Sequence, residues 1–445
     1  VLGYVKIASP KILVEEVNAL VQKLDSTGQA AFMLPMFLSR FGYPEFAGVS
    51  PTDDVTLVLL NDPASESGNP GVVLLMNATA ESQIAQAIQQ QTQAVNRKTG
   101  DWMLMAQDED DLALVVDDRE LIGLARQPRQ RDIEVILLAD GLIDTEDTIM
   151  ETVRTDLAEA DDMPEPLKQW IEPGLNVLFG EIKATEKAVF GLDLSPEFIA
   201  FAMDLDALGG TPLGRFLSQQ SRGRVSGGRY LPDDFAITGV GDFDAAATKA
   251  YNEHVFDALL AVAPEGSREN LTRLKELNSA YYGNMEGPVG MGFSLTNLQA
   301  NYLQYVAGDF DDEQVKAVYD FTYSKLMPGI METVNRTDQP APMTFTFHPE
   351  AGEIAGVTYH KAVQNMELPE EAIETNPQLA GVANQEVYVS VVSGDTLIGT
   401  DLDKFSDVLS AVQAGQPVAD NISANFSQPE PGVVFQGEMD LIRYY

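Results

Sequence analysis

Clusters of aspartate are the side chains of this chain whose type and spacing come closest to a known binding chemistry. Calcium is bound by several oxygens of one loop, often with a glycine at the sharpest turn. Two acidic stretches offer such oxygens, and the candidate ligands are Asp108, Asp110, Asp309 and Asp311. Neither stretch follows the D-x-[DN]-x-[DN]-G pattern closed by a glutamate. Both lie where a hairpin needs a turn or a helix needs an N-terminal acceptor, so we predict turns and caps, with calcium as the alternative.

The three histidines are not expected to form a metal site. His254 falls within a predicted helix, where a partly buried structural role is expected. His348 and His360 fall in the two strands of a predicted hairpin over 343–360. Pairing around a turn near Ala351 would place these two rings far apart along the strand ladder. We therefore predict no joint metal ligation.

The motifs that mark common enzymes are missing from this sequence. Gly239-Val240-Gly241 lies between a predicted strand and a predicted helix, but Asp244 stands where a dinucleotide-binding loop has its third glycine. No G-x-S-x-G, H-E-x-x-H or Walker sequence occurs, and no cysteine is present. We therefore predict no catalytic residue, no bound cofactor and no enzyme. A hydrolase with an unrecognised carboxylate site stays open as an alternative.

The charge balance limits the partners of the protein. The 445 residues include 68 acidic and 28 basic side chains, which gives a formal net charge of −40. Such a surface repels nucleic acid and anionic lipid headgroups, because both are attracted by Lys and Arg. No stretch approaches the ~20 apolar residues of a membrane helix. We expect no nucleic-acid partner and no transmembrane segment in this chain.

The absence of cysteine and the acidic surface favour an exported bacterial protein over a cytoplasmic enzyme. Val1 already lies within a predicted strand, so we expect that an export signal or anchor precedes it. The predicted location is extracytoplasmic, in the periplasm or at the cell surface.

A unit made of a strand, a cap residue and an amphipathic helix recurs along the chain. It lies at 4–24, 133–157 and 235–260, and in a shortened form at 387–412. At its first occurrence, Ser9 and Pro10 form a strong helix start, which Thr211 and Pro212 repeat. Thr79, and either Asp242 or Asp244, are further predicted helix caps. Two longer segments, 132–220 and 234–326, predict the same order of elements, βααββα, with an offset of about 102 residues. This agreement predicts a duplicated module.

A smaller unit of hairpin and helix is predicted twice. In 101–127, two strands at 102–106 and 112–116 are joined by an acidic turn at 108–111, and a helix starts at Asp118. The unit over 386–412 has the same order, with its helix starting at Asp401.

These repeats predict an α+β fold of tandem βααββα modules, with mainly antiparallel sheets and helices packed on one face. A linker rich in Gly, Ser and Arg is expected near 221–229. It would separate two halves, 1–225 and 226–445. The predicted modules are 1–95, 99–127 and 132–220 in the first half, and 234–326, 341–384 and 386–445 in the second.

Two phrases of the sequence resemble a group of exported proteins. The stretch DFAITGV at 234–240, and DWMLM at 101–105 with DLALV at 111–115, resemble the large repeat-containing proteins of unknown function from planctomycete-type bacteria. The resemblance implies an envelope location and internal repeats. It implies no catalytic residue.

Together these observations predict a non-enzymatic exported protein of the bacterial envelope, structural or protein-binding, with a protein partner or self-association. The alternative is a periplasmic carrier of a lipid or other hydrophobic ligand. An apolar segment at 32–41 is expected to be part of the core, with a hydrophobic-ligand groove or an interface as the alternative.

Overall fold

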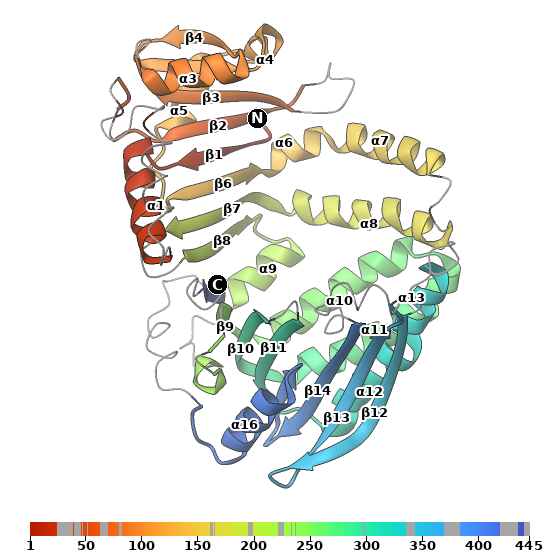
Figure 1. The fold of residues 1–445 in the computed structure, drawn as a ribbon. Helices are drawn as coiled ribbons and strands as arrows, with labels where there is room; N and C mark the ends of the chain where they lie inside the picture. Colours follow the sequence, from red (N-terminus) through yellow and green to blue (C-terminus); the bar gives the residue numbers. More distant parts are fainter. Residues whose placement is uncertain are drawn as a thin grey trace. The chain divides into compact units, whose positions relative to one another are not determined.

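The computed structural model describes residues 1–24, 39, 46, 48–50, 52–62, 70–79, 82–160, 163, 165–194, 199–220, 227–232, 234–235, 237–296, 299–334, 343–368, 383–418 and 435–439. The chain divides into two units (Figure 1). Unit 1 comprises Val1–Thr152 and Glu181–Leu208, and unit 2 comprises Val153–Gly180 and Gly209–Tyr445. Both contain helices and antiparallel strands, which confirms the predicted α+β class.

Unit 1 is built on an antiparallel sheet with the strand order β4-β5-β3-β2-β1-β6-β7-β8. Its strands are β1 (Gly3–Ile7), β2 (Val55–Leu60), β3 (Gly71–Asn77), β4 (Val95–Thr99), β5 (Trp102–Ala106), β6 (Ile133–Leu138), β7 (Thr185–Leu194) and β8 (Ile199–Ala207). Its helices are α1 (Pro10–Leu24), α3 (Gln83–Thr92), α4 (Glu109–Ala113), α5 (Asp118–Ala125), α6 (Ala139–Asp144), the start of α7 (Glu146–Glu159) and the end of α8 (Glu165–Lys183).

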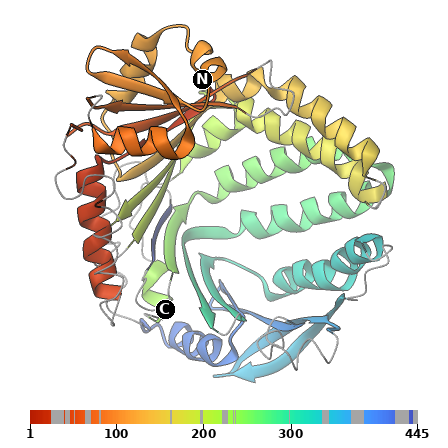
Figure 2. The same cartoon turned by 45° about the horizontal axis from the view of Figure 1, so that its top comes forward.

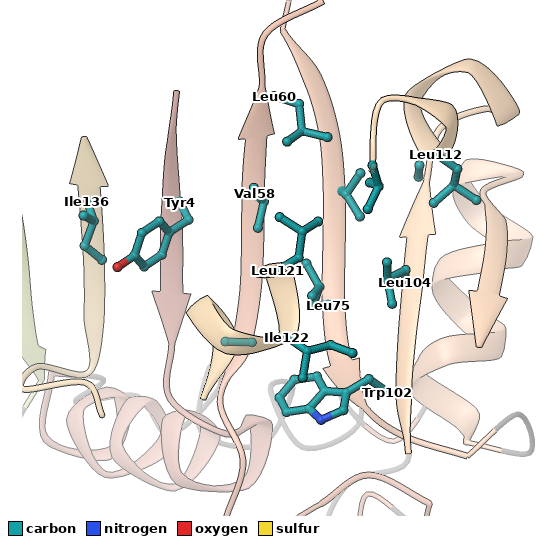
Figure 3. Packing of buried hydrophobic residues seen from close by; sticks show 14 residues of the cluster. Tyr4, Val58, Leu60, Leu75, Trp102, Leu104, Leu112, Leu121, Ile122 and Ile136 are labelled. Atoms are coloured by element: carbon teal, nitrogen blue, oxygen red, sulfur yellow. The ribbon is translucent and has the colours of Figure 1, made fainter. Parts of the chain in front are cut away.

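Helices cover both faces of this sheet at its β2-β3-β5 end. On one face, Leu121 and Ile122 of α5 and Leu112 of α4 pack with Val58, Leu75, Trp102 and Leu104 (Figure 3). On the other face, Ala85 of α3 packs with Met76, Met103 and Met105. Neighbouring residues of a strand point to opposite faces, so Leu104 and Met105 belong to different cores. The prediction that helices pack on one face only was wrong, because these strands are apolar on both faces.

Unit 2 is built on an antiparallel sheet with the order β12-β13-β14-β15-β11-β10-β9-β16. Its strands are β9 (Ile237–Phe243), β10 (Met285–Thr296), β11 (Gln299–Gly308), β12 (Met343–Ile354), β13 (Val357–Met366), β14 (Asn384–Val392), β15 (Asp395–Gly399) and β16 (Phe435–Met439). Its helices include α9 (Pro212–Gln219), α10 (Ala245–Val262), α11 (Arg268–Gly283), α12 (Asp312–Phe321), a π-helical turn (Thr322–Leu326), α13 (Met327–Val334) and α16 (Leu402–Gln413).

The sheet of unit 2 is also covered on both faces. Phe405, Val408 and Leu409 of α16 pack on Leu303 and Leu397. On the other face, Val315 of α12 packs with Val289, Val306 and Ile398, and the helices α10 and α11 lie side by side (Figure 2).

The predicted helix starts are confirmed where a short polar side chain precedes the helix. The side chains of Thr211, Asp244, Asp311 and Asp401 each accept a hydrogen bond from a backbone N–H of the first turn of α9, α10, α12 and α16. These bonds satisfy donors that a helix leaves without an internal partner. One predicted cap was wrong, since Ser82 and not Thr79 caps α3.

The predicted strand at 112–116 was wrong. Residues Glu109–Ala113 form α4, and the Asp108 carboxylate accepts the Asp111 N–H at 2.9 Å as its N-cap. Three acidic residues in the first turn favour this helix through its dipole. The hairpin partner of β5 is β4, which lies earlier in the chain, and its other neighbour in the sheet is β3.

The predicted geometry of the 343–360 hairpin was also wrong. Its turn lies at Ala355-Gly356, whose φ angles of 52° and 81° are both positive, as a two-residue type I′ turn requires. His348 therefore pairs with Lys361, beside His360, and is not far from it along the ladder. Because His360 and Lys361 point to opposite faces, His348 and His360 still face away from each other.

Two predicted features lie outside the described residues. These are positions 221–226 of the linker and the apolar segment 32–41 except Ser39. The module boundaries stay predictions.

Candidate functional site

An apolar surface lies on one side of strands β6, β7 and β8 of unit 1. Directly opposed residues form three rows across the strands, and residues two apart on a strand share a face. The nine members, which we call the apolar face, are Ile133, Leu192 and Phe201; Val135, Phe190 and Met203; and Leu137, Ala188 and Leu205.

The largest side chains of the apolar face are open to solvent. Phe190, Phe201 and Met203 are 41%, 55% and 61% exposed. The other six are half-buried. A single exposed apolar residue needs no explanation, but a contiguous group marks a binding surface.

The strand pattern makes this exposure unusual. On β8 the apolar face carries Phe201, Met203 and Leu205, while the reverse side carries Asp204 and Asp206. In an antiparallel sheet such alternation normally turns the apolar side into the core. Here Phe201 and Met203 on the apolar side of β8 remain exposed.

Sequence reasoning missed the apolar face. The alternation at 199–207 was available as a signal and predicts a strand with one apolar side. Nothing local indicates that this side is left open, because cover comes from elements distant in sequence.

A second feature of unit 1 is a cluster of charged side chains at the start of β6. Arg129 donates to Asp54 at 2.9 Å and to Asp132 at 3.1 Å, and Arg131 donates to Asp193 at 2.8 Å. Backbone N–H groups also donate hydrogen bonds to these carboxylates. The Leu194 N–H donates to the Asp132 side chain at 2.8 Å, and the Asp132 N–H donates to the Asp193 side chain at 3.2 Å. These carboxylates are held as parts of ion pairs, which fasten the loop before β6 to the sheet.

Lys6 of β1 extends this cluster into the interior. Its side chain is 1% exposed, and its Nζ donates to the carbonyl oxygen of Gln127. Burial lowers the pKa of Lys6, while the nearby carboxylates of Asp54 and Glu134 act in the opposite direction. A buried ammonium with these partners ties the 127–132 loop to β1.

Glu16 of α1 is the most perturbed carboxyl group of the cluster. Burial, together with the charge of Asp132 and a hydrogen bond to its carboxylate, raises the pKa of Glu16 to about 7. Its Oε2 atom is closed off from solvent and has no hydrogen-bond partner. Near neutral pH this carboxyl therefore carries a proton much of the time. The protonated carboxyl donates a hydrogen bond to the Asp132 carboxylate.

A small polar recess in unit 1 has a volume of about 260 Å³. It is lined by Gly48, Val49, Ser50, Asn77, Ala78, Thr79, Lys98 and Asp101. The Asn77 amide already donates to Asp53. The recess is smaller than most ligand pockets, which start near ~300 Å³ and are mainly apolar.

The calcium candidates lie at helix starts. Asp108 caps α4 and Asp110 follows in its first turn, while Asp311 caps α12, with its Oδ1 accepting the Glu313 N–H at 3.1 Å. Asp309 precedes that helix, and its N–H donates to the Asn284 carbonyl at 2.9 Å. Among the residues that the structure describes, no group of three or more His, Cys, Asp or Glu is arranged to hold a metal ion.

His360 is fully buried in unit 2, and both ring nitrogens have partners. The Glu350 N–H donates to Nδ1 at 3.0 Å, and Nε2 lies 3.0 Å from Asp312 Oδ1. The first bond leaves Nδ1 without a proton, so Nε2 carries the proton and donates to Asp312. This histidine connects β13 with α12 and the β12 strand.

No family model, curated protein or solved structure matches the chain. The resemblance to exported repeat-containing proteins therefore stays a prediction. In the described part of the chain, the helices are too short or too polar to cross a membrane.

Proposed function

We propose that this chain is a non-enzymatic exported protein of the bacterial envelope that works by binding a protein partner. The observation that carries the proposal is the apolar face, with Phe190, Phe201 and Met203 exposed beside one another. Aromatic residues and methionine are enriched where proteins bind each other. Burying such side chains contributes about 25 cal/mol per Å² of apolar surface, so leaving them open in the free protein is costly unless a partner covers them.

The charged cluster supports the alternative of a hydrolase less well than the apolar face supports protein binding. Its carboxylates Asp132 and Asp193 are occupied by arginines and backbone donors, and general acid–base work needs a group within reach of a substrate proton. We therefore favour binding over catalysis.

We also propose that 132–220 and 234–326 are copies of one module. The order β6, α7, α8, β7, β8, α9 in the first is matched by β9, α10, α11, β10, β11, α12 in the second, with the short α6 as an addition. The junctions also correspond: the Leu208 N–H donates to the Ala184 carbonyl at 2.8 Å, and the Asp309 N–H donates to the Asn284 carbonyl at 2.9 Å. Superposing both segments in an experimental structure should align these junctions; unmatched helix pairs would contradict duplication.

Photo-crosslinking in the producing cells tests the binding function. A photoreactive phenylalanine analogue replaces Phe201, and a control carries it at Val116, which is 98% exposed but lies outside the apolar face. We expect a discrete protein adduct from position 201 in an envelope fraction and none from position 116. Equal adducts at both positions, or none at 201, would contradict the proposal. Recovery of the protein in the cytoplasmic fraction alone would contradict export.

A further inference from the structure

We infer that the apolar face receives a cationic amphipathic helix of a partner protein. This inference rests on the proposed binding function and adds the chemistry of the partner. Three observations carry it, namely the dimensions of the face, the way helices cover the rest of the same sheet, and the net charge of the chain.

The dimensions of the apolar face suit one helix. Strands lie about 4.8 Å apart, so three strands present a strip about 10 Å wide, close to the diameter of a helix with its side chains. Three rows, two residues apart on each strand, span about 14 Å along the strands. A helix rises 1.5 Å per residue, so a segment of about ten residues covers that length with two to three apolar turns.

Helices already cover apolar surface elsewhere in the sheet of unit 1. On this same side of the sheet, Ala85 of α3 packs on Met103 and Met105 of β5. The register places Val5 and Leu57 on this side as well, next to Val135 of the apolar face. The apolar face is thus the continuation of a surface whose other end binds a helix through small and apolar side chains.

The net charge of the chain selects the sign of the partner. The nine positions of the apolar face carry no charge, and Asp193, Asp204 and Asp206 of β7 and β8 lie on the reverse side, where Asp193 pairs with Arg131 and Asp206 with Lys187. The whole chain carries a formal net charge of −40. This field attracts a helix whose polar side carries Lys or Arg and repels one that carries Glu. It also repels a second copy of this chain.

Fluorescence anisotropy with synthetic peptides tests the inference. The probe is an amphipathic peptide of about 18 leucines and lysines, long enough to form a helix. One comparison peptide replaces each lysine by glutamate, and another scrambles the leucine–lysine order so that no apolar side forms. The full chain is titrated at about 50 mM salt and again at about 500 mM, where charges are screened.

Variants locate the binding site. F201S/M203S shortens two exposed side chains of the apolar face without changing charge, and V116S is the matched control on an exposed residue elsewhere in unit 1. In a W170F background, Trp102 fluorescence reports whether each variant keeps the unit 1 core. If the double variant does not fold, the single variant M203Q is used in its place to locate the binding site.

The inference expects the amphipathic leucine–lysine peptide to bind at least tenfold more tightly than either comparison peptide. It also expects F201S/M203S to lose at least tenfold in affinity and V116S to lose none. Equal binding of the scrambled peptide would mean that charge alone is responsible, and would overturn the inference. Equal binding of lysine and glutamate peptides, both lost in F201S/M203S, would overturn the cationic partner but leave the binding function intact. Binding to phosphatidylcholine vesicles and not to peptides would replace the helix with a lipid, and dimers that F201S/M203S abolishes would replace it with a second copy.

Discussion

Neutralising Glu16 should remove a pH dependence from the stability of unit 1. The side chain belongs to α1 and meets the charged groups Asp132, Asp193 and Arg129. Its raised pKa means that the folded protein holds a proton at pH values where the unfolded chain has lost it. Glu16 therefore stabilises the fold fully below the unfolded pKa of 4.5, and this contribution is lost as the pH rises through about 7.

The magnitude follows from the displacement of the pKa. A change from 4.5 to about 7 corresponds to roughly 3.4 kcal/mol at 1.36 kcal/mol per unit. Glu16 is only half-buried, so solvent screening reduces this figure, and we expect about 1–2 kcal/mol. Raising the pH from about 5.5 to about 8.5 should lower the free energy of unfolding by that amount more in the natural chain than in E16Q.

Urea unfolding followed by Trp102 fluorescence measures this difference. Trp102 lies in the core of unit 1, and a W170F background removes the other tryptophan. The control is E15Q, since Glu15 is the exposed neighbour of Glu16 on α1. E15Q should keep the pH dependence of the natural chain. An E16Q protein with an unchanged pH dependence, or one less stable than the natural chain at about pH 8.5, would refute the reasoning.

Three further substitutions test the structural account by urea unfolding. K6M should cost roughly 3 kcal/mol, because it leaves the Gln127 carbonyl and the adjacent carboxylates without their buried partner; full stability would contradict the assignment. F405A should cost about 3–5 kcal/mol in unit 2, since Phe405 of α16 is fully buried against the sheet, and a loss below ~1 kcal/mol would mean that α16 is not packed as described. D401A should cost about 1 kcal/mol through loss of the bonds from the Asp403 and Lys404 N–H groups, and D401N should recover most of it.

The sequence predicted best those features that depend on neighbours in the chain. The caps Asp244, Asp311 and Asp401 and the Thr211-Pro212 start are local hydrogen-bond arrangements, so residue type and spacing suffice. The error at 112–116 arose because a short apolar run fits a buried strand and a helical turn equally well. The hairpin error arose because the turn at Ala355-Gly356 lacks the Asn-Gly or Asp-Gly signal of a type I′ turn.

The candidate site could not be predicted because it depends on contacts between distant segments. Phe190 and Met203 read as ordinary core residues, and their exposure is set by what covers the sheet. The displaced pKa of Glu16 arises from burial and from the charges of Asp132 and Asp193, which lie outside α1 and give no signal in the sequence around Glu16. The acidic residues that drew attention first, Asp108 and Asp311, are helix caps.

The most direct test of the central claim is the oxidation rate of Met203 in the purified protein and in the cells that produce it. Methionine is oxidised in proportion to its accessibility, and Met76 and Met105 of the same unit are internal standards, being 1% and 2% exposed. We predict that mass spectrometry finds Met203 oxidised far faster than both standards in the purified protein and protected in cells, where a partner covers it. Protection of Met203 in the purified protein, or equal oxidation in cells, would contradict an open apolar face that a partner occupies.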